Sequence, residues 1–204
     1  MKPSPITLPG YAINEYQLVI SPHQELRDKI KTVRELFCSK YGIAAPIRGN
    51  AHVTLVHFKQ YAMMEERILG RLSRVAMGFP AFKVECRDFG SYPSHSLFIR
   101  VATREPVREL VKEIKPFQAL LRLNTDHKPH FMEEPHIPLA TRLLPWQYEK
   151  GWLEYSRQHF SGRFMADGML LLRRRALSGE PYQILKRMAF MNLPVSTRQG
   201  ELFG

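Results

Sequence analysis

The sequence has no apolar run close to the roughly 20 residues that span a bilayer, so we expect no membrane segment. Its first ten residues, MKPSPITLPG, contain three prolines and no continuous apolar stretch, and we expect no signal peptide. Only two cysteines occur, Cys38 and Cys86, outside any metal-ligand spacing. Free thiols of this kind are typical of a reducing compartment, which predicts a cytoplasmic protein.

The chain also lacks a glycine-rich phosphate loop and a dinucleotide fingerprint after any predicted strand, which disfavours a parallel nucleotide-binding fold. Acidic residues are outnumbered, 19 Asp and Glu against 30 Lys and Arg, for a net charge of +11. This balance favours a polyanionic or phosphorylated partner, although a basic solvated surface without a partner explains it equally well. A hydrophobic content of 44% predicts a folded chain over most of its 204 residues.

Short strands and amphipathic helices alternate along the chain. Alternating and β-branched patterns predict strands at 14–22, 52–58, 81–90, 96–103, 135–142, 163–177 and 182–191. Apolar residues at helical spacing predict helices at 23–42, 63–78, 105–123 and 145–160, the third kinked at Pro116. Hairpin connections with interspersed helices favour an α+β fold with antiparallel sheets.

The order of elements suggests a duplicated architecture. Strand-helix-strand-helix occurs once before residue 80 and recurs, with a hairpin first, over 96–143. We therefore expect residues 1–204 to form a single bilobal domain with a core of about 12–192 and a polar tail at 193–204.

Two predicted strands carry a matching histidine pattern, AHVTLVHF from residue 51 and PHIPLATR from residue 135. Because side chains alternate along a strand, His52 and Thr54 share one face, opposite their apolar neighbours. His136, Pro138 and Arg142 share a face in the same way. Each strand thus turns one histidine away from its apolar side, which suits the lining of a groove better than the filling of a core.

The first HxT segment, followed 84 residues later by a second, similar segment, resembles the two-histidine (2H) phosphoesterases. These include the LigT-type 2′-5′ RNA ligases and the 2′,3′-cyclic phosphodiesterases, and the resemblance covers roughly residues 14–192. It implies a bilobal, pseudo-two-fold fold whose antiparallel sheets line a central groove, with helices outside and with no required metal or cofactor. By this resemblance His52 and His136 face each other across the phosphate of an RNA end or nucleotide with a cyclic phosphate.

The chemistry of these residue types agrees with that expectation. With an ordinary pKa near 6.5, one imidazole can be neutral and the other protonated near neutral pH, so that one removes a proton and the other donates one. Such help is typically worth about 10²–10⁴-fold in rate. The hydroxyl of Thr54 can bind a non-bridging phosphoryl oxygen, and the guanidinium of Arg142 suits a phosphate, although Arg142 lies six residues beyond His136 along the strand.

Pro138 departs from the family pattern, which expects Thr or Ser there. Proline offers neither a hydroxyl nor an N–H, and the lost hydrogen bond to a charged group costs about 1.5–3 kcal/mol, or roughly 10–150-fold. The sequence therefore predicts a slow site or one with an altered substrate. The alternative from another class is an RNA- or nucleotide-binding module with a degenerate, weakly active site.

Other polar and aromatic residues have competing interpretations. His57 is predicted to share the apolar side of its strand and to be structural. The three arginines at 173–175 have two interpretations that the sequence leaves open, protection of a sheet edge and contact with RNA phosphates. Asp126, His127 and His130 suggest a metal site, but zinc sites usually have further ligands. The rings of Tyr92 and Phe131 could stack on a base, although core packing explains them better.

The tail carries a separate signal. QGELF, at 199–203, fits the Gln-x-x-Leu-Phe pattern that resembles sliding-clamp-binding peptides. Gln199, Leu202 and Phe203 would then dock into a clamp, which gives a third hypothesis, a partner-binding adaptor. A match this short is common by chance.

Overall fold

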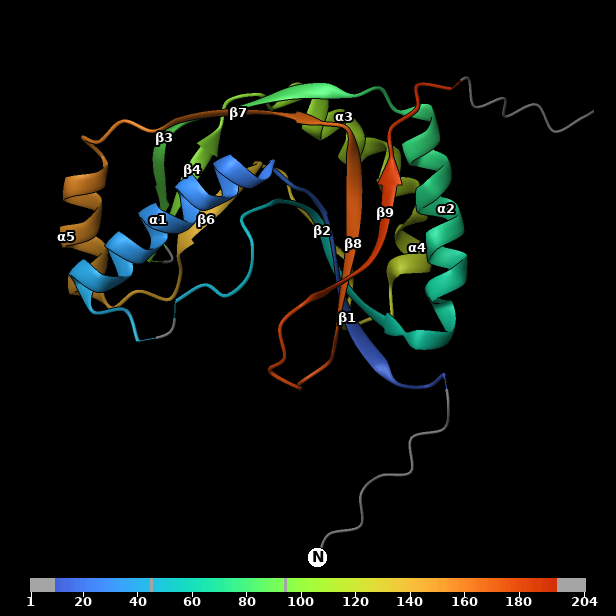
Figure 1. Ribbon diagram of the computed structural model, residues 1–204. Helices are drawn as coiled ribbons and strands as arrows, with labels where there is room; N and C mark the ends of the chain where they lie inside the picture. The colour runs from blue at the N-terminus through green and yellow to red at the C-terminus, as the bar shows by residue number, and fades with distance from the viewer. Residues whose placement is uncertain (1–9, 45, 94, 194–204) are drawn as a thin grey trace, which may run out of the picture.

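The computed structural model describes residues 10–44, 46–93 and 95–193, and Figure 1 shows its two sheets. The first sheet has the strand order β5-β2-β1-β8-β9 and the second has the order β6-β4-β3-β7, with every recorded pairing antiparallel. The strands of the first sheet are β1 (Ile13–Ile20), β2 (Val53–Tyr61), β5 (His130–Phe131), β8 (Gly168–Arg175) and β9 (Gln183–Ala189). Those of the second are β3 (Phe82–Tyr92), β4 (Ser96–Val101), β6 (His136–Ala140) and β7 (Ser161–Ala166).

The helices divide between the two sheets. Beside the second sheet lie α1 (Gln24–Tyr41) and α5 (Pro145–Tyr155), and beside the first lie α2 (Glu65–Gly78), α3 (Glu105–Ile114) and α4 (Gln118–Leu121), as Figure 1 shows. Two 3₁₀ turns, Ala62–Met64 and Lys115–Phe117, precede α2 and α4. The buried side chains of both halves form one cluster. The predicted α+β fold with antiparallel sheets is confirmed.

Local signals explain where α1 ends and where the third predicted helix breaks. α1 stops at Gly42, whose φ of 59° is left-handed and natural for glycine, and the N–H of Ile43 reaches back to the carbonyl of Cys38. The predicted helix over 105–123 breaks into α3, a 3₁₀ turn and α4, because Pro116 cannot donate an intrahelical hydrogen bond.

The strand predicted at 163–177 is two strands that belong to different sheets. β7 lies in the second sheet and β8 in the first, with Asp167 alone between them. Gly168 follows at once, and a Cβ there would lie 2.6 Å from the carbonyl oxygen of Met188. The prediction of a single strand is wrong because the chain crosses between sheets at this Asp-Gly pair, a combination that favours a turn.

Two further expectations meet the structure differently. Between the helix predicted at 105–123 and the strand predicted at 135–142, where the sequence predicts neither helix nor strand, lies the short strand β5, which pairs with β2. The proposed clamp-binding residues Gln199, Leu202 and Phe203 lie outside the described residues. Over the described part of the chain, every helix is too short or too polar to cross a membrane.

Candidate active site

His52 lies immediately before β2, and Thr54 is the second residue of that strand. Val53 and Leu55 are fully buried, whereas His52 and Thr54 are partly exposed. β2 is a hydrophobic strand whose alternate residues face the core, so the polar residues between them are turned outward. The predicted division of faces is confirmed at the first segment.

His136 begins β6 and shows the same division. Ile137 and Leu139 are fully buried, whereas His136 and Pro138 are partly exposed. β6 is the edge strand of the second sheet, and it comes close to β2 of the first, with Cα atoms within 8 Å. An edge strand can contain a proline without losing a bond of the sheet ladder, which explains the proline in this apolar strand.

The two histidines make the same hydrogen bond to the backbone. Nδ1 of His52 lies 3.0 Å from the carbonyl oxygen of Asn50, and Nδ1 of His136 lies 2.8 Å from that of Glu134, in each case two residues earlier. A carbonyl oxygen only accepts, so each Nδ1 must carry the proton and donate it. In both rings Nε2 is therefore the nitrogen left to accept a proton when neutral, or to donate one when charged.

The surroundings of His52 keep it neutral. Burial and, to a lesser extent, the positive charge of Arg34 lower its pKa, the hydrogen bond to Asn50 acts to raise it, and the net pKa is about 4. Neither effect depends on a bound ligand. Near neutral pH the free Nε2 of His52 is a proton acceptor.

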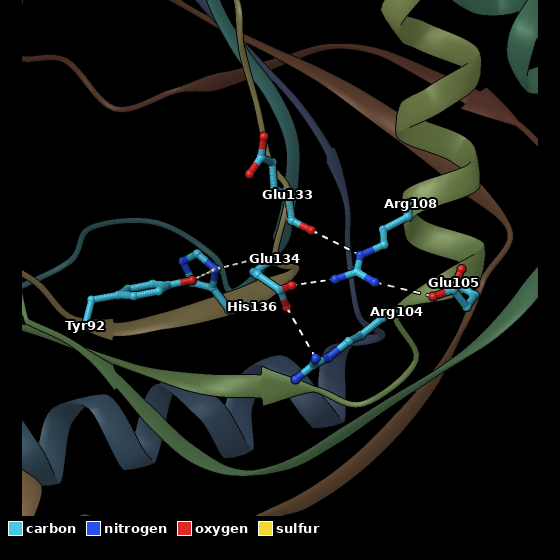
Figure 2. Close-up of polar contacts among 7 residues, drawn as sticks. All are labelled: Tyr92, Arg104, Glu105, Arg108, Glu133, Glu134 and His136. Carbon is cyan, nitrogen blue, oxygen red and sulfur yellow. Dashed lines mark hydrogen bonds and ion pairs between the residues drawn. The ribbon is translucent and has the colours of Figure 1, made fainter.

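His136 has different neighbours. Burial lowers its pKa, but the carbonyl and the carboxylate of Glu134 both act to raise it. The rings of Tyr92 and Phe98 lie against it, with centroids 5.3 Å and 4.9 Å away. Figure 2 shows the Tyr92 hydroxyl at Nδ1, at 3.4 Å, a weak second contact beside the shorter bond to the Glu134 carbonyl.

Glu134 is held in turn by two arginines at the start of α3. Its carboxylate forms ion pairs with Arg104, at 3.6 Å, and with Arg108, whose Nε also donates to the carbonyl of Glu133 (Figure 2). All three charged side chains are about half exposed, so the pairs contribute at most about 1 kcal/mol of stability each. Their effect is to fix where the carboxylate lies relative to His136.

Arg34 was not singled out from the sequence. It lies on the buried stripe of α1 between Ile30 and Phe37, and its guanidinium donates to the carbonyls of Pro138 and Gly49. One residue thus contacts backbone beside both histidines. The sequence does contain a signal for it: Arg34 lies on the apolar stripe of the predicted helix, four residues after Ile30, and a charge placed there needs buried hydrogen-bond partners.

Arg142 lies beyond the end of β6, exposed to solvent. Its φ of 56° is left-handed, which is uncommon for a residue other than glycine, and it marks a turn of the chain after the strand. Arg142 therefore does not continue the strand face that carries His136, and its contact with substrate stays a prediction.

The predicted placement of His57 on the apolar side is wrong. The pairing of β1 with β2 shifts between Leu18 and Val19, so both Leu55 and Val56 are buried and His57 is partly exposed. A β-bulge of this kind inserts one residue and reverses the alternation beyond it. Nε2 of His57 lies 3.3 Å from the hydroxyl of Tyr182.

The arginine run does not protect a sheet edge, because β8 is an interior strand. Arg173 pairs with Glu65 of α2 at 3.0 Å, and Arg174 pairs with Glu15 at 2.5 Å and lies over the ring of Tyr182. Both guanidinium groups thus have internal partners. Their contact with RNA phosphates stays a prediction.

The suggested metal site gains no support. Within residues 10–44, 46–93 and 95–193, no three His, Cys, Asp or Glu side chains gather as a metal-binding group. His127 instead lies 2.9 Å from the side-chain oxygen of Asn124 in a local turn. Phe131 packs against the core, whereas Tyr92 borders a cavity of about 190 Å³ that Phe98 and Glu134 also line.

The sequence also matches a known protein family. The profile of the 2′-5′ RNA ligase superfamily matches residues 21–177. The chain belongs to the 2′-5′ RNA ligase superfamily. The resemblance to two-histidine phosphoesterases is thereby confirmed, and membership indicates an enzyme of the phosphoesterase type.

Solved structures share the fold of this chain. E. coli LigT in complex with 3′-AMP superposes with a TM-score of 0.62 at 16% identity, covering 88% of this chain and 98% of LigT. TT0787 of Thermus thermophilus gives 0.63 at 18% identity, covering 87% and 98%. No curated protein matches the sequence. At these identities the structural likeness shows the fold alone.

Proposed function

We propose that the protein is a metal-independent phosphoesterase that acts on a 2′,3′-cyclic phosphate or a 2′-5′ phosphodiester of RNA or a small nucleotide. His52 acts as the general base and His136 as the general acid. Support comes from the superfamily membership and from solved LigT structures in complex with 3′-AMP and with phosphate.

In hydrolysis, Nε2 of His52 takes a proton from water as the water oxygen attacks phosphorus. The bond from phosphorus to one ribose oxygen breaks, and Nε2–H of His136 protonates that oxygen as it leaves. One proton enters at His52 and one leaves at His136, so a proton exchange with solvent resets the pair. In ligation a 5′-hydroxyl attacks the cyclic phosphate in place of water, and the roles are the same: His52 accepts the proton of that hydroxyl and His136 protonates the ribose oxygen that leaves.

The observation that carries this proposal is the matched bond from each Nδ1 to the carbonyl two residues before it. That bond leaves Nε2 of both rings for the substrate. Two histidines that only filled a core would not need matched orientations of this kind. The charges near the rings then divide the roles, because Arg34 favours neutral His52 while Glu134 favours protonated His136.

The phosphate itself needs positive or donor groups where charge develops. The hydroxyl of Thr54, on the face of His52, donates to a non-bridging oxygen. We assign Arg142 a more distant role, contact with a flanking phosphate of an RNA end, since it lies past the strand that carries His136.

The test is turnover of a panel of 2′,3′-cyclic nucleotides in the presence of chelator. We expect hydrolysis that persists in chelator and falls about 10²–10⁴-fold in His52→Ala and in His136→Ala. His159→Ala, which changes an exposed histidine beside Asp88 of β3, serves as the matched control and should keep full activity. Wild-type rates in both site variants would refute the assignment.

Pro138 favours one alternative, a nucleotide-binding module with a weakly active site, because the second segment lacks the hydroxyl that the first one has. The enzyme converts a cyclic nucleotide to product, whereas the binding module only binds it. Tight binding of a cyclic nucleotide without any turnover, lost in His52→Ala, would support the binding module over the enzyme.

A further inference from the structure

Arg34 has an environment that is unusual for a charged side chain. It lies on the core side of α1, in the same stripe as Leu26, Ile30 and Phe37, and only 8% of its surface is exposed. Burial lowers its pKa to about 10, which leaves it charged at neutral pH. A buried charge is retained only when hydrogen-bond acceptors surround it, so its partners indicate its purpose.

Those partners are backbone carbonyls beside the two histidines. Nε and Nη2 donate to the carbonyl oxygen of Pro138, at 3.0 Å and 2.7 Å, and Nη1 donates to that of Gly49, at 3.3 Å. Pro138 lies two residues after His136, and Gly49 lies three residues before His52. The two segments, which belong to different sheets, therefore meet at one guanidinium.

The geometry of the edge strand explains why an arginine is needed there. In a strand, the N–H and C=O of one residue point to the same side, and the carbonyl of Pro138 points to Arg34, away from the ladder with β4. Proline has no N–H on that side, so its carbonyl is the single backbone group left to satisfy. The planar fork of arginine supplies two donors to that oxygen and a third to Gly49.

We propose that Arg34 is a positioning residue that ties the segment of His52 to the segment of His136 and thereby sets their relative placement. The proposal rests on the proposed function of the two histidines. Arg34 does not need to touch the substrate for this role, because its contacts are with the backbone on either side of the site. It also supplies hydrogen-bond donors to the carbonyl of Pro138, at a strand edge where proline itself has no N–H.

The charge of Arg34 gives the proposal a second consequence. Arg34 lowers the pKa of His52, and the titratable group beside it on α1 is Cys38, whose thiol pKa is raised by burial. The thiol is neutral at neutral pH, so it does not cancel the charge of Arg34. Position and charge can be separated experimentally, since lysine keeps the charge and loses the fork.

The experiment compares Arg34→Lys and Arg34→Met with the exposed control Arg71→Met on α2. We expect kcat on a 2′,3′-cyclic nucleotide to fall about 10²-fold in both Arg34 variants with KM nearly unchanged, because misplacement by about 1 Å has that effect. Proton NMR should show altered imidazole signals of both His52 and His136. The pKa of His52 should rise from about 4 in Arg34→Met and stay low in Arg34→Lys.

Several outcomes would overturn the proposal. Full kcat in folded Arg34→Lys and Arg34→Met would do so, as would a rise in KM alone, which indicates substrate binding. Altered signals at His52 with His136 unchanged would show that the segments are not tied. Thermal unfolding checks both variants, and if Arg34→Met does not fold, Arg34→Lys decides by itself. If the wild type hydrolyses nothing, the proposed function fails, while the NMR comparison still tests the tie.

Discussion

The two histidine segments share a backbone frame and differ in their surroundings. In both, a histidine on the exposed face of a strand donates Nδ1–H to the carbonyl two residues earlier. The first segment has Thr54 two residues on and a buried arginine behind it, whereas the second has Pro138 and a carboxylate beside it. The shared frame makes the rings equivalent in geometry, and the unequal neighbours make them unequal as acids.

This difference moves the expected pH optimum. Activity requires His52 without its added proton, so it rises with pH through a value near 4, and it requires His136 with that proton, so it falls through a value below the ordinary 6.5. The optimum of kcat/KM should lie on the mildly acidic side, rather than near neutral pH as unperturbed imidazoles predict.

The largest expected effect separates the base from the acid. On a nitrophenyl phosphodiester the leaving oxygen needs no proton, so His136→Ala should keep most of the wild-type rate, whereas His52→Ala should still lose about 10²–10⁴-fold. Release of nitrophenolate measures both. Equal losses in the two variants on this substrate would show that the division of roles is wrong.

An intermediate effect concerns the residues two positions after each histidine. Thr54→Val keeps the shape and removes the hydroxyl, and should lower kcat about 10–150-fold. Pro138→Thr adds the hydroxyl missing from the second segment and should raise kcat by up to the same factor. Pro138→Ala is the control for loss of the ring, and initial rates on a cyclic nucleotide report all three. An unchanged rate in Pro138→Thr would mean that the hydroxyl does not limit turnover.

A smaller effect tests the carboxylate beside the acid. The charge of Glu134 acts to raise the pKa of His136, so Glu134→Gln should lower that pKa and move the high-pH limb of kcat/KM to lower pH. The low-pH limb, set by His52, should stay in place. At neutral pH the rate should fall about tenfold for each unit of displacement, and a few-fold is expected.

Glu105→Gln is the matched control for that change. Glu105 pairs with the same Arg108 but is 79% exposed and does not act on His136. Its pH profile should equal that of the wild type. A shift of both limbs in Glu134→Gln would indicate a general disturbance of the site.

The smallest effect is expected at Arg142. Arg142→Met should leave kcat unchanged and raise KM a few-fold for an RNA end, with less effect on a mononucleotide, because one phosphate contact is lost. The difference should shrink as salt is raised. A large loss of kcat on the mononucleotide would instead place this guanidinium at the reacting phosphate.

Sequence reasoning succeeded where the information is local. The faces of His52 and His136 follow from strict alternation with buried Val53 and Ile137, the end of α1 follows from Gly42, and the break after α3 lies at the kink predicted at Pro116. Each of these depends on residues a few positions away. Such features can be predicted from one segment without knowledge of its partners.

The features that sequence reasoning missed depend on distant partners. The role inferred for Arg34 depends on its hydrogen bond to Pro138, 104 residues away. His57 lies on the opposite face from the one predicted because β2 has a bulge against β1. The change of sheet at Asp167 depends equally on which strands already occupy each sheet. Pairing and packing of remote segments decide these points, and no local pattern encodes them.

The single residue between β7 and β8 limits how the two halves can move. The carbonyl of Asp167 accepts from the N–H of Phe190, and its carboxylate pairs with Arg187, both near or in β9. Domain closure is absorbed by a few loop or element-terminal residues, and at this crossing the one linking residue is itself bonded to Phe190 and Arg187, which restricts it. Selection of a ligand should then depend on how well it fits fixed walls, and release of product should proceed without a gate that must first swing open.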